Sequence, residues 1–424
     1  MRNLIIKIMQ TGGAKIYSVL LGIITLSITA RWLGPEGRGI VASVITWVNI
    51  FTELAAVSLG SVLIFKATKD RDEKWIPKML GTLLGHTLIV TLLSWSLIAL
   101  LYMAGHYWGL PNVLGEIPAI ALLVGFIILP LGLWDVYSRD LLNIEDRLGV
   151  YNKFQIVGST ANSLSIVVLV VVSGFGVLGV LFSKIIWQSI IAIGGIRDLI
   201  SHTSTKITYS YETYKDLLKN GLKMHLGTIG AIMTTSIDII MVNAYLGNEQ
   251  TGIYQLAVQM SQLMLIVSYS ANTVLQGELT RKGVHGVWSY QKKILGLTLA
   301  FIIASAIFMG FTAKWWLIVL AGEEFRGAII IFQLLLITIV VNTITTVMSV
   351  QWIGRGWFLL NSGITLFKGV MNIGLNALLI PKYGILGAVY ATIAVITFSL
   401  CINIAMFIYC ELDARRHNKQ QAET

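Results

Sequence analysis

The chain has 424 residues, of which 55% are hydrophobic and only 12% are charged, and its mean hydropathy is +0.76. A soluble globular protein carries about 25% charged residues, so this composition excludes a soluble enzyme and indicates a membrane protein with many spans. The net charge of +10 would suit nucleic acid, but the basic residues follow membrane topology, so we expect no nucleic-acid partner.

The chain begins with two cations, Arg2 and Lys7, and continues into an apolar run that ends without a small-residue cleavage site. This pattern predicts a first spanning helix and not a removed signal. A spanning helix needs about 20 mostly apolar residues. The sequence on this criterion predicts an all-α fold with twelve transmembrane helices, at 9–31, 39–65, 79–103, 117–140, 150–172, 176–197, 220–246, 253–276, 293–312, 327–350, 358–380 and 385–410.

Lysine and arginine alternate sharply between the connections on the two sides of the predicted helices. With a cytoplasmic N-terminus, 23 of the 31 basic residues lie on the inner side, five on the outer side and three inside helices. Such an excess predicts that both the N- and the C-terminus are cytoplasmic. It also favours contact with the anionic lipids of the inner leaflet.

A glycine-rich turn recurs in the second half of the chain. LGPEGRGI, Leu33 to Ile40, returns as LGNEQTGI, Leu246 to Ile253, at an offset of 213. FGVLG, Phe175 to Gly179, returns as YGILG, Tyr383 to Gly387, at an offset of 208. Glycine between apolar runs marks a tight turn, so each longer copy predicts a hairpin between two helices. Two matches at similar offsets predict a chain of two similar halves.

Each half holds six predicted helices, an even number, so both halves enter the membrane from the same side as parallel repeats. The predicted domains are an N-terminal six-helix lobe at 1–200, a cytoplasmic linker at 201–219 and a C-terminal six-helix lobe at 220–424. The outer connections are short. No soluble domain that could house an external active site is therefore predicted.

Several predicted helices carry polar residues at steps of three and four, which place them on one helix face. The two longest stripes are Gln255, Gln259, Gln262, Tyr269, Thr273 and Gln276 in one helix, and Asn361, Thr365, Lys368, Asn372 and Asn376 in another. Single polar residues are interpreted as hydrogen-bonded packing contacts between helices. Long amides repeated over several turns favour a wet cavity for a hydroxyl-rich ligand, so Gln255, Gln259, Gln262 and Asn372 are predicted to bind substrate.

Five ionisable residues fall deep within predicted helices, where a charge costs about 2.5–3.5 kcal/mol on insertion scales. They are Lys15, Glu53, Lys184, Asp238 and Lys368. Internal ion pairs, for instance of Lys15 or Lys184 with Glu53, would give them a purely structural role, and Lys15 could also snorkel to the interface. As the functional alternative, Glu53 and Asp238 couple transport to H⁺ or Na⁺, because a desolvated carboxylate changes protonation readily.

The remaining polar residues predict no catalytic centre. Arg31 and Arg38 flank the outer turn and are interpreted as capping or snorkelling residues. The histidines are scattered, and no HExxH, GxSxG or phosphate-loop pattern is present. The two cysteines, Cys401 and Cys410, lie in the last predicted helix and predict neither a disulfide framework nor a metal site.

Two segments resemble a known family. ARWLGPEGRGIV, Ala30 to Val41, and LNALLIPKYGILGAVYATI, Leu375 to Ile393, are similar to the polysaccharide flippases of the multidrug/oligosaccharidyl-lipid/polysaccharide exporter superfamily. Length, helix number and the two-half organisation agree over the whole chain. The resemblance implies two six-helix lobes around a central cavity and alternating access. It also implies a substrate, an undecaprenyl-diphosphate-linked oligosaccharide.

The resemblance further implies a place and a pathway. The expected location is the bacterial inner membrane, where the chain would serve O-antigen and lipopolysaccharide, capsule or exopolysaccharide synthesis beside polymerase and chain-length proteins. Given such a substrate, we expect Lys15, Lys184 and Lys368 to attract the diphosphate of the carrier lipid. No catalytic residue is carried over from the family, and no cofactor beyond H⁺ or Na⁺ is expected.

Two other functions fit the sequence less well. A multidrug or small-molecule antiporter of the same superfamily would need an aromatic and acidic cavity, whereas this sequence offers amides and lysines. A membrane polysaccharide polymerase or ligase would need a large outer loop with catalytic Arg or His, which is missing. The sequence therefore favours a flippase, which is not an enzyme.

Overall fold

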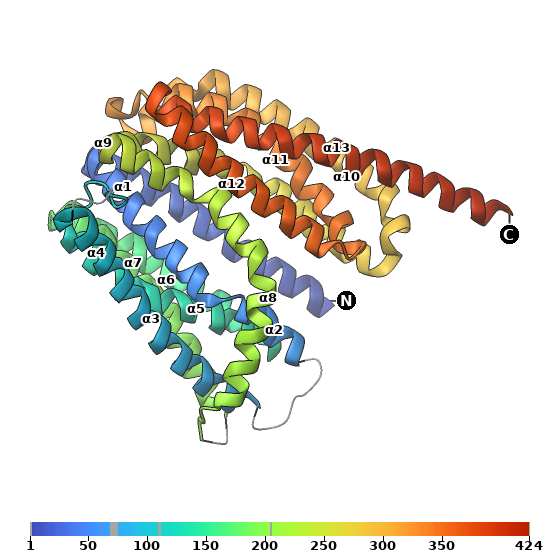
Figure 1. Ribbon diagram of the computed structural model, residues 1–424, viewed down its shortest axis with the longest axis horizontal. Coiled ribbons are helices and arrows are strands. Elements are labelled where there is room, and N and C mark those ends of the chain that lie inside the picture. The colour runs from blue at the N-terminus through green and yellow to red at the C-terminus, as the bar shows by residue number, and fades with distance from the viewer. Residues whose placement is uncertain (1, 68–74, 109–111, 204–205, 424) are drawn as a thin grey trace. The chain divides into compact units, whose positions relative to one another are not determined.

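The computed structural model describes residues 2–67, 75–108, 112–203 and 206–423, with side chains from Tyr17 onward except at 418, 419 and 421–423. These residues form helices and no strand (Figure 1), which confirms the predicted all-α fold. Ten helical segments of this described part are long and apolar enough to cross a membrane. The chain is thus a multi-pass membrane protein.

The chain folds into two compact units. Unit 1 comprises Met1–Ile232 with Asn243–Gly252, and unit 2 comprises Met233–Val242 with Ile253–Thr424. The start of the predicted C-terminal lobe, up to Ile232, therefore packs as part of unit 1. The predicted lobes at 1–200 and 220–424 describe the sequence repeat, and their boundaries stay a prediction.

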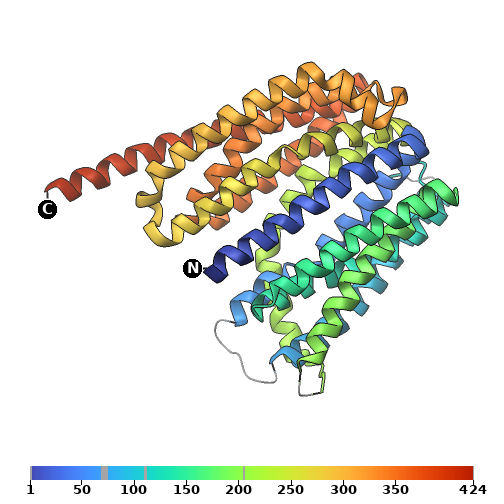
Figure 2. The same cartoon turned by 180° about the vertical axis from the view of Figure 1, so that it is seen from behind.

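The helices that precede residue 236 are α1 (Arg2–Ala56), α2 (Leu59–Ala67), α3 (Trp75–Tyr107), α4 (Ala119–Phe126), α5 (Ile128–Ile144), α6 (Leu148–Ile166), a π-helical turn (Val167–Val172), α7 (Gly176–Ser201) and α8 (Tyr211–Thr235). In unit 1, α6 packs against α1 and α7, and α5 packs against α7 (Figure 2). Leucines that are fully buried, such as Leu80, Leu129 and Leu133, fill the core between these helices.

The helices of the second half are α9 (Ile237–Gln262), α10 (Leu265–Ala321), a 3-10 turn (Glu323–Phe325), α11 (Ala328–Gly354), α12 (Phe358–Tyr383) and α13 (Ile385–Glu423). In unit 2, α11 packs against α10 and α13, and α12 packs against α13. Val287, Trp288, Val347 and Met348 form a buried apolar cluster there.

Three helical segments are too long for one bilayer crossing and are divided by glycines. Gly34, Gly247 and Gly283 all have φ between 64° and 80°, a left-handed conformation that glycine adopts without steric cost. The segments they divide are Tyr17–Ala67, Tyr211–Gln262 and Leu265–Ala321. Divided there, the ten described segments give thirteen pieces, close to the twelve predicted spans, because the predicted span 253–276 is itself broken where α9 ends and α10 begins.

The sequence repeat is also present in the backbone. Gly34 has φ 64° and ψ −177°, and its equivalent Gly247 has φ 80° and ψ −177°. In the second pair of turns, Gly176 has φ 54° and Gly384 has φ 59°. Gly34 and Gly176 of the first half thus each have a counterpart of similar φ in the second half.

Several spans that were expected to be continuous helices are broken in the structure. The span 39–65 is interrupted at Val57 and Ser58, which have φ of 47° and 52°. A β-branched residue in this region is a genuine outlier that only tertiary contacts can hold. Ser58 Oγ lies 3.1 Å from His225 Nδ1 of α8, and Gly221 of α8 gives the Val57 carbonyl room to approach.

The two copies of the glycine-rich turn meet within unit 1. A Cβ added to Gly39 would lie 1.8 Å from the carbonyl oxygen of Asn248, and one added to Gly252 would lie 1.9 Å from that of Pro35. Asn248 in turn donates a hydrogen bond of 3.1 Å to the carbonyl of Glu116. Only glycine permits this reciprocal backbone contact.

We expect Gly39→Ala to destabilise the protein, because overpacking a tight contact costs about 1–3 kcal/mol. The neighbours of the new methyl group are backbone atoms, which cannot move away as a side-chain end can. The measurement is the thermal unfolding midpoint of the purified protein in detergent.

Gly22→Ala is the matched control, since a Cβ at Gly22, also in α1, would meet nothing within 4 Å. It should leave the midpoint unchanged or raise it. Equal midpoints for Gly39→Ala and Gly22→Ala would contradict the reciprocal contact.

Candidate functional site

A buried carboxylate lies at the meeting point of three helices of unit 2. Asp238 of α9 is 6% exposed. Its Oδ1 accepts a hydrogen bond of 2.7 Å from Asn376 Nδ2 of α12, and its Oδ2 accepts one of 3.0 Å from Thr392 Oγ1 of α13. Tyr254 of α9 donates its hydroxyl at 3.3 Å to the same Oδ2. We call these residues, with Asn372, the Asp238 cluster.

The Asp238 cluster holds a negative charge with neutral donors alone. Among the described residues, Asp238 forms no ion pair with Lys, Arg or His. Asn376 also donates to Asn372 Oδ1, while Asn376 Oδ1 itself is buried and has no hydrogen-bond partner among the described residues. A buried charge of this kind is normally paired or coordinates a cation, and carboxylate and carbonyl oxygens are the ligands that hard cations prefer.

The oxygen atoms of the Asp238 cluster determine which cation it could bind. No group of three or more His, Cys, Asp or Glu that could hold a metal is found in the described part of the chain. One carboxylate among amide and hydroxyl oxygens suits a single positive charge, that is a proton or Na⁺. Asp238, Asn376 and Thr392 are the residues that would hold it.

Unit 1 contains two neighbouring positive charges in its interior. Arg38 of α1 is 6% exposed and donates a hydrogen bond of 2.8 Å to Thr29 Oγ1. Lys184 of α7 lies with its Nζ 4.3 Å from the centre of the Trp187 ring, and the charge of Arg38 acts on it. Two like charges inside the protein cost free energy, which an anion close to both would offset. Arg38, interpreted from the sequence as a capping or snorkelling residue, is therefore a buried candidate.

The other predicted site residues are dispersed. Lys368 lines a cavity in unit 2 and is not part of the Asp238 cluster, whereas Asn372, one helical turn away, belongs to that cluster. Glu53 of unit 1 has an exposed side chain. Lys15 lies outside the residues whose side chains the structure describes.

The predicted glutamine stripe forms part of α9. Gln255 donates a hydrogen bond of 3.1 Å to Gln259, and both are half-buried, while Gln262 is exposed near the end of the helix. The role of these three residues in binding substrate stays a prediction.

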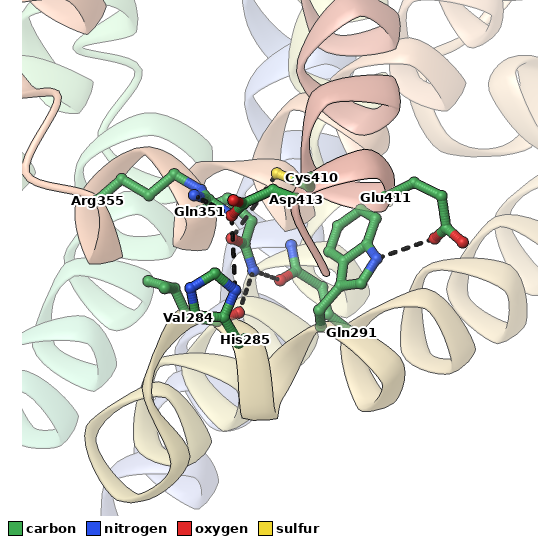
Figure 3. Close-up of polar contacts among 9 residues, drawn as sticks. Val284, His285, Gln291, Gln351, Arg355, Cys410, Glu411 and Asp413 are labelled. Carbon is green, nitrogen blue, oxygen red and sulfur yellow. Dashed lines mark hydrogen bonds and ion pairs between the residues drawn. The ribbon is translucent and has the colours of Figure 1, made fainter. Parts of the chain in front are cut away.

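A further polar cluster joins three helices of unit 2 (Figure 3). Gln351 of α11 donates to Gln291 Oε1 of α10 at 2.7 Å and to the Val284 carbonyl at 3.3 Å. Its Oε1 accepts from the Cys410 thiol of α13 at 3.8 Å. Every strong donor and acceptor of this buried amide is used, so it holds helices together and offers nothing to a ligand.

The charges at the edge of this cluster are also paired. Arg355 donates a hydrogen bond of 2.8 Å to Asp413, and Lys292 donates one of 2.7 Å to Glu411. Trp288 donates to the same oxygen of Glu411 at 3.0 Å. These contacts fasten α13 to α10 and α11, and we interpret them as structural.

Of the residues described above, Asp238, Lys184 and Asn372 were predicted from the sequence as site residues, whereas Arg38 and the hydroxyl partners of Asp238 were not. Tyr254 and Thr392 were not singled out, because a single hydroxyl in an apolar helix resembles any packing contact. Asn376 was noted only as a member of a stripe. The signal that could have found them was a pattern of polar residues at equal depth in three different helices.

Comparison with known proteins gives the family. A family model described as polysaccharide biosynthesis protein matches residues 5–276. An uncharacterized membrane protein of Methanocaldococcus jannaschii is 21% identical over 403 residues, which are 90% of this chain and 92% of that protein.

Solved structures share the fold. The lipid II flippase MurJ in an inward closed conformation has a TM-score of 0.74 at 15% identity, over 95% of this chain and 90% of that one. An inward-facing multidrug resistance MATE family transporter of the MOP superfamily has a TM-score of 0.73 at 17% identity, over 95% and 96%. The family match confirms the family resemblance drawn from the sequence. The two solved structures agree with it and show the fold alone.

Proposed function

We infer the function from one premise: this chain belongs to the polysaccharide biosynthesis protein family. We propose that it flips undecaprenyl-diphosphate-linked oligosaccharide repeat units across the bacterial inner membrane by alternating access. The product would serve O-antigen, capsule or exopolysaccharide synthesis, beside polymerase and chain-length proteins. The observation that carries this proposal is the pair of cations, Arg38 and Lys184, inside unit 1.

The cations suit the diphosphate of the carrier lipid. A diphosphate cannot enter hydrocarbon unless positive charge offsets its desolvation. Lys184 forms no ion pair with any described carboxylate, so its ammonium group can offer all three donors to an anion. Lysine acts as a mobile point charge, which suits a ligand that must bind and then leave.

The Asp238 cluster suits the coupling of transport to a cation. Asp238 binds a proton or Na⁺ in one access state and releases it in the other. When the cation is bound, the carboxylate charge is neutralised, and the hydrogen bonds that Asp238 accepts become weaker. Because Asn376 and Thr392 come from α12 and α13, the charge state of Asp238 changes the attraction among three helices.

Orientation follows from the basic residues. We propose that both termini are cytoplasmic, so that the lipid-linked substrate enters from the side that carries most of the lysines and arginines. The inside-negative potential then favours outward movement of a negative charge by about 2.3 kcal/mol per 100 mV.

A cation-coupled multidrug antiporter is the second candidate. The buried carboxylate of the Asp238 cluster favours it, because such a group also suits exchange of a proton for a cationic drug. Arg38 and Lys184 would repel such a drug. The two candidates are separated by substrate charge.

The proposed function is tested by depleting the protein in its native cells. We expect lipid-linked saccharide to accumulate in the inner leaflet and surface polysaccharide to disappear, with unchanged sensitivity to cationic drugs. Loss of drug resistance with normal surface polysaccharide would contradict a flippase and support the antiporter.

A further inference from the structure

Unit 2 contains a polar cavity of about 380 Å³. It lies among α10, α11, α12 and α13, all within that unit. The lining includes amides, hydroxyls and two aromatic side chains, and Lys368 is its one charged residue among the described lining residues. Its volume falls in the range of small-molecule sites, about 300–1,000 Å³.

The hydroxyl groups of the lining offer acceptors to a ligand. Ser349 Oγ donates its proton to the Thr346 carbonyl at 2.7 Å, and Thr365 Oγ1 donates to the Asn361 carbonyl at 2.8 Å. Each donor is therefore used within its own helix. Ser349 Oγ also accepts a hydrogen bond of 2.7 Å from Asn272 Nδ2. What remains for the cavity is its other lone pair and the lone pairs of Thr365 Oγ1.

Asn403 adds a stronger acceptor. Its side chain lines the cavity and is 4% exposed. Its Nδ2 donates to the Ser399 carbonyl at 2.8 Å and to Thr345 Oγ1 at 3.2 Å. Its Oδ1 is buried and has no hydrogen-bond partner among the described residues. A buried carbonyl left unpaired costs about 1–3 kcal/mol, so a ligand that donates to it would be favoured.

Lys368 is the strong donor of the cavity. Its Nζ lies 3.5 Å from Ser399 Oγ, a weak contact, and it forms no ion pair with a described carboxylate. The ammonium group can therefore donate to a ligand oxygen. A cationic ligand would be repelled by the same charge.

A ligand for this cavity must both donate and accept. A phosphate without protons only accepts, so it could satisfy Lys368 but would face the acceptors of Asn403, Ser349 and Thr365. A sugar hydroxyl does both, and Trp352 and Tyr269 provide aromatic faces for the apolar side of a ring. We propose that this cavity is a sugar subsite for the glycan of the lipid-linked substrate. The proposal rests on the proposed function.

The assignment changes the role of Lys368. From the sequence, Lys368 was expected to attract the diphosphate together with Lys184. The cavity separates the two roles: Lys184 and Arg38 in unit 1 attract the diphosphate, while Lys368 and Asn403 in unit 2 bind hydroxyl groups of the sugar.

Binding of two lipids to the purified full-length protein tests this division. One probe is undecaprenyl diphosphate, and the other is the same lipid carrying the saccharide extracted from the native cells. We expect Lys368→Gln and the near-isosteric Asn403→Leu each to weaken binding of the saccharide-bearing lipid about tenfold, the effect of one lost hydrogen bond to a charged or buried partner. Binding of undecaprenyl diphosphate should stay within about twofold of wild type.

Two variants serve as references. Lys382→Gln, an exposed lysine on the same helix, should leave both affinities unchanged. Lys184→Gln should weaken both lipids alike, because both carry the diphosphate.

Three results would overturn the proposal. Equal weakening of both lipids by Lys368→Gln would make the cavity a phosphate site. Unchanged binding of both lipids in Lys368→Gln and Asn403→Leu would show that the cavity holds no part of the substrate. Failure of the wild-type protein to bind either lipid would refute the proposed function itself and the subsite with it.

Discussion

Replacing Asp238 with asparagine is expected to slow flipping at least about tenfold, because it removes the group that binds the coupling cation. Tenfold corresponds to about 1.4 kcal/mol, less than a typical hydrogen bond to a charged group. Asparagine has nearly the same shape, and the hydroxyls of Thr392 and Tyr254 can rotate to meet it, so the folded protein should remain. The measurement is the initial flipping rate in proteoliposomes under an imposed pH or Na⁺ gradient.

Glu323→Gln is the matched control, because Glu323 is an exposed carboxylate of unit 2 whose side chain is 65% accessible. It should flip at the wild-type rate. Glu53→Gln is predicted to slow transport as well, but by less than Asp238→Asn. Glu53 is exposed, whereas Asp238 is buried and accepts hydrogen bonds from several side chains. Wild-type rates for Asp238→Asn under every gradient would refute a coupling role.

Replacing Lys184 with glutamine should reduce flipping at least about tenfold, because a buried site for a diphosphate then loses half of its positive charge. Glutamine keeps a donor but not the Coulombic attraction, which is strongest where water is excluded. Lys184→Arg should keep binding and slow release, since a guanidinium holds phosphate in a fixed two-pronged geometry. The measurement is flipping rate together with affinity for undecaprenyl diphosphate.

Lys314→Gln is the control for this series, since Lys314 is exposed and lies in a predicted outer connection. It should have no effect on either quantity. If Lys184→Gln flips at the wild-type rate, the lysine is a structural residue that rests on Trp187, and the anion is bound elsewhere.

The sequence predicted the helices, their approximate number and the paired turns, because these features are local. An apolar run of bilayer length has few alternatives to a spanning helix. A glycine between two such runs, as at Gly34 and Gly247, marks a reversal whose left-handed conformation other residues resist. The two halves could therefore be aligned from their turns.

The breaks within helices could not be predicted in the same way. Val57 and Ser58 lie in an apolar run with no glycine or proline at the break, and their conformation is held by Ser58 with His225 and by Gly221 in α8. Such a break depends on contacts between segments distant in the chain, which hydropathy does not contain.

The candidate site was predicted only as a set of charges and amides, without their contacts. Lys368 and Asn372 share one face of α12, yet a single helical turn places them in different clusters, because each depends on what α9, α11 and α13 present at that depth. Arg38 follows an outer turn in the sequence, and packing buries it. Periodicity gives the face of a helix, whereas partners come from the tertiary structure.

Flipping by the purified wild-type protein tests the proposed function most directly. The protein is reconstituted into liposomes whose inner leaflet contains fluorescent lipid-linked saccharide, and a membrane-impermeant quencher detects the saccharide that reaches the outside. We expect flipping that depends on the protein and on an imposed H⁺ or Na⁺ gradient, and that Asp238→Asn abolishes the gradient dependence. Absence of flipping under both gradients, from vesicles that export a cationic dye when a gradient is imposed, would contradict a flippase.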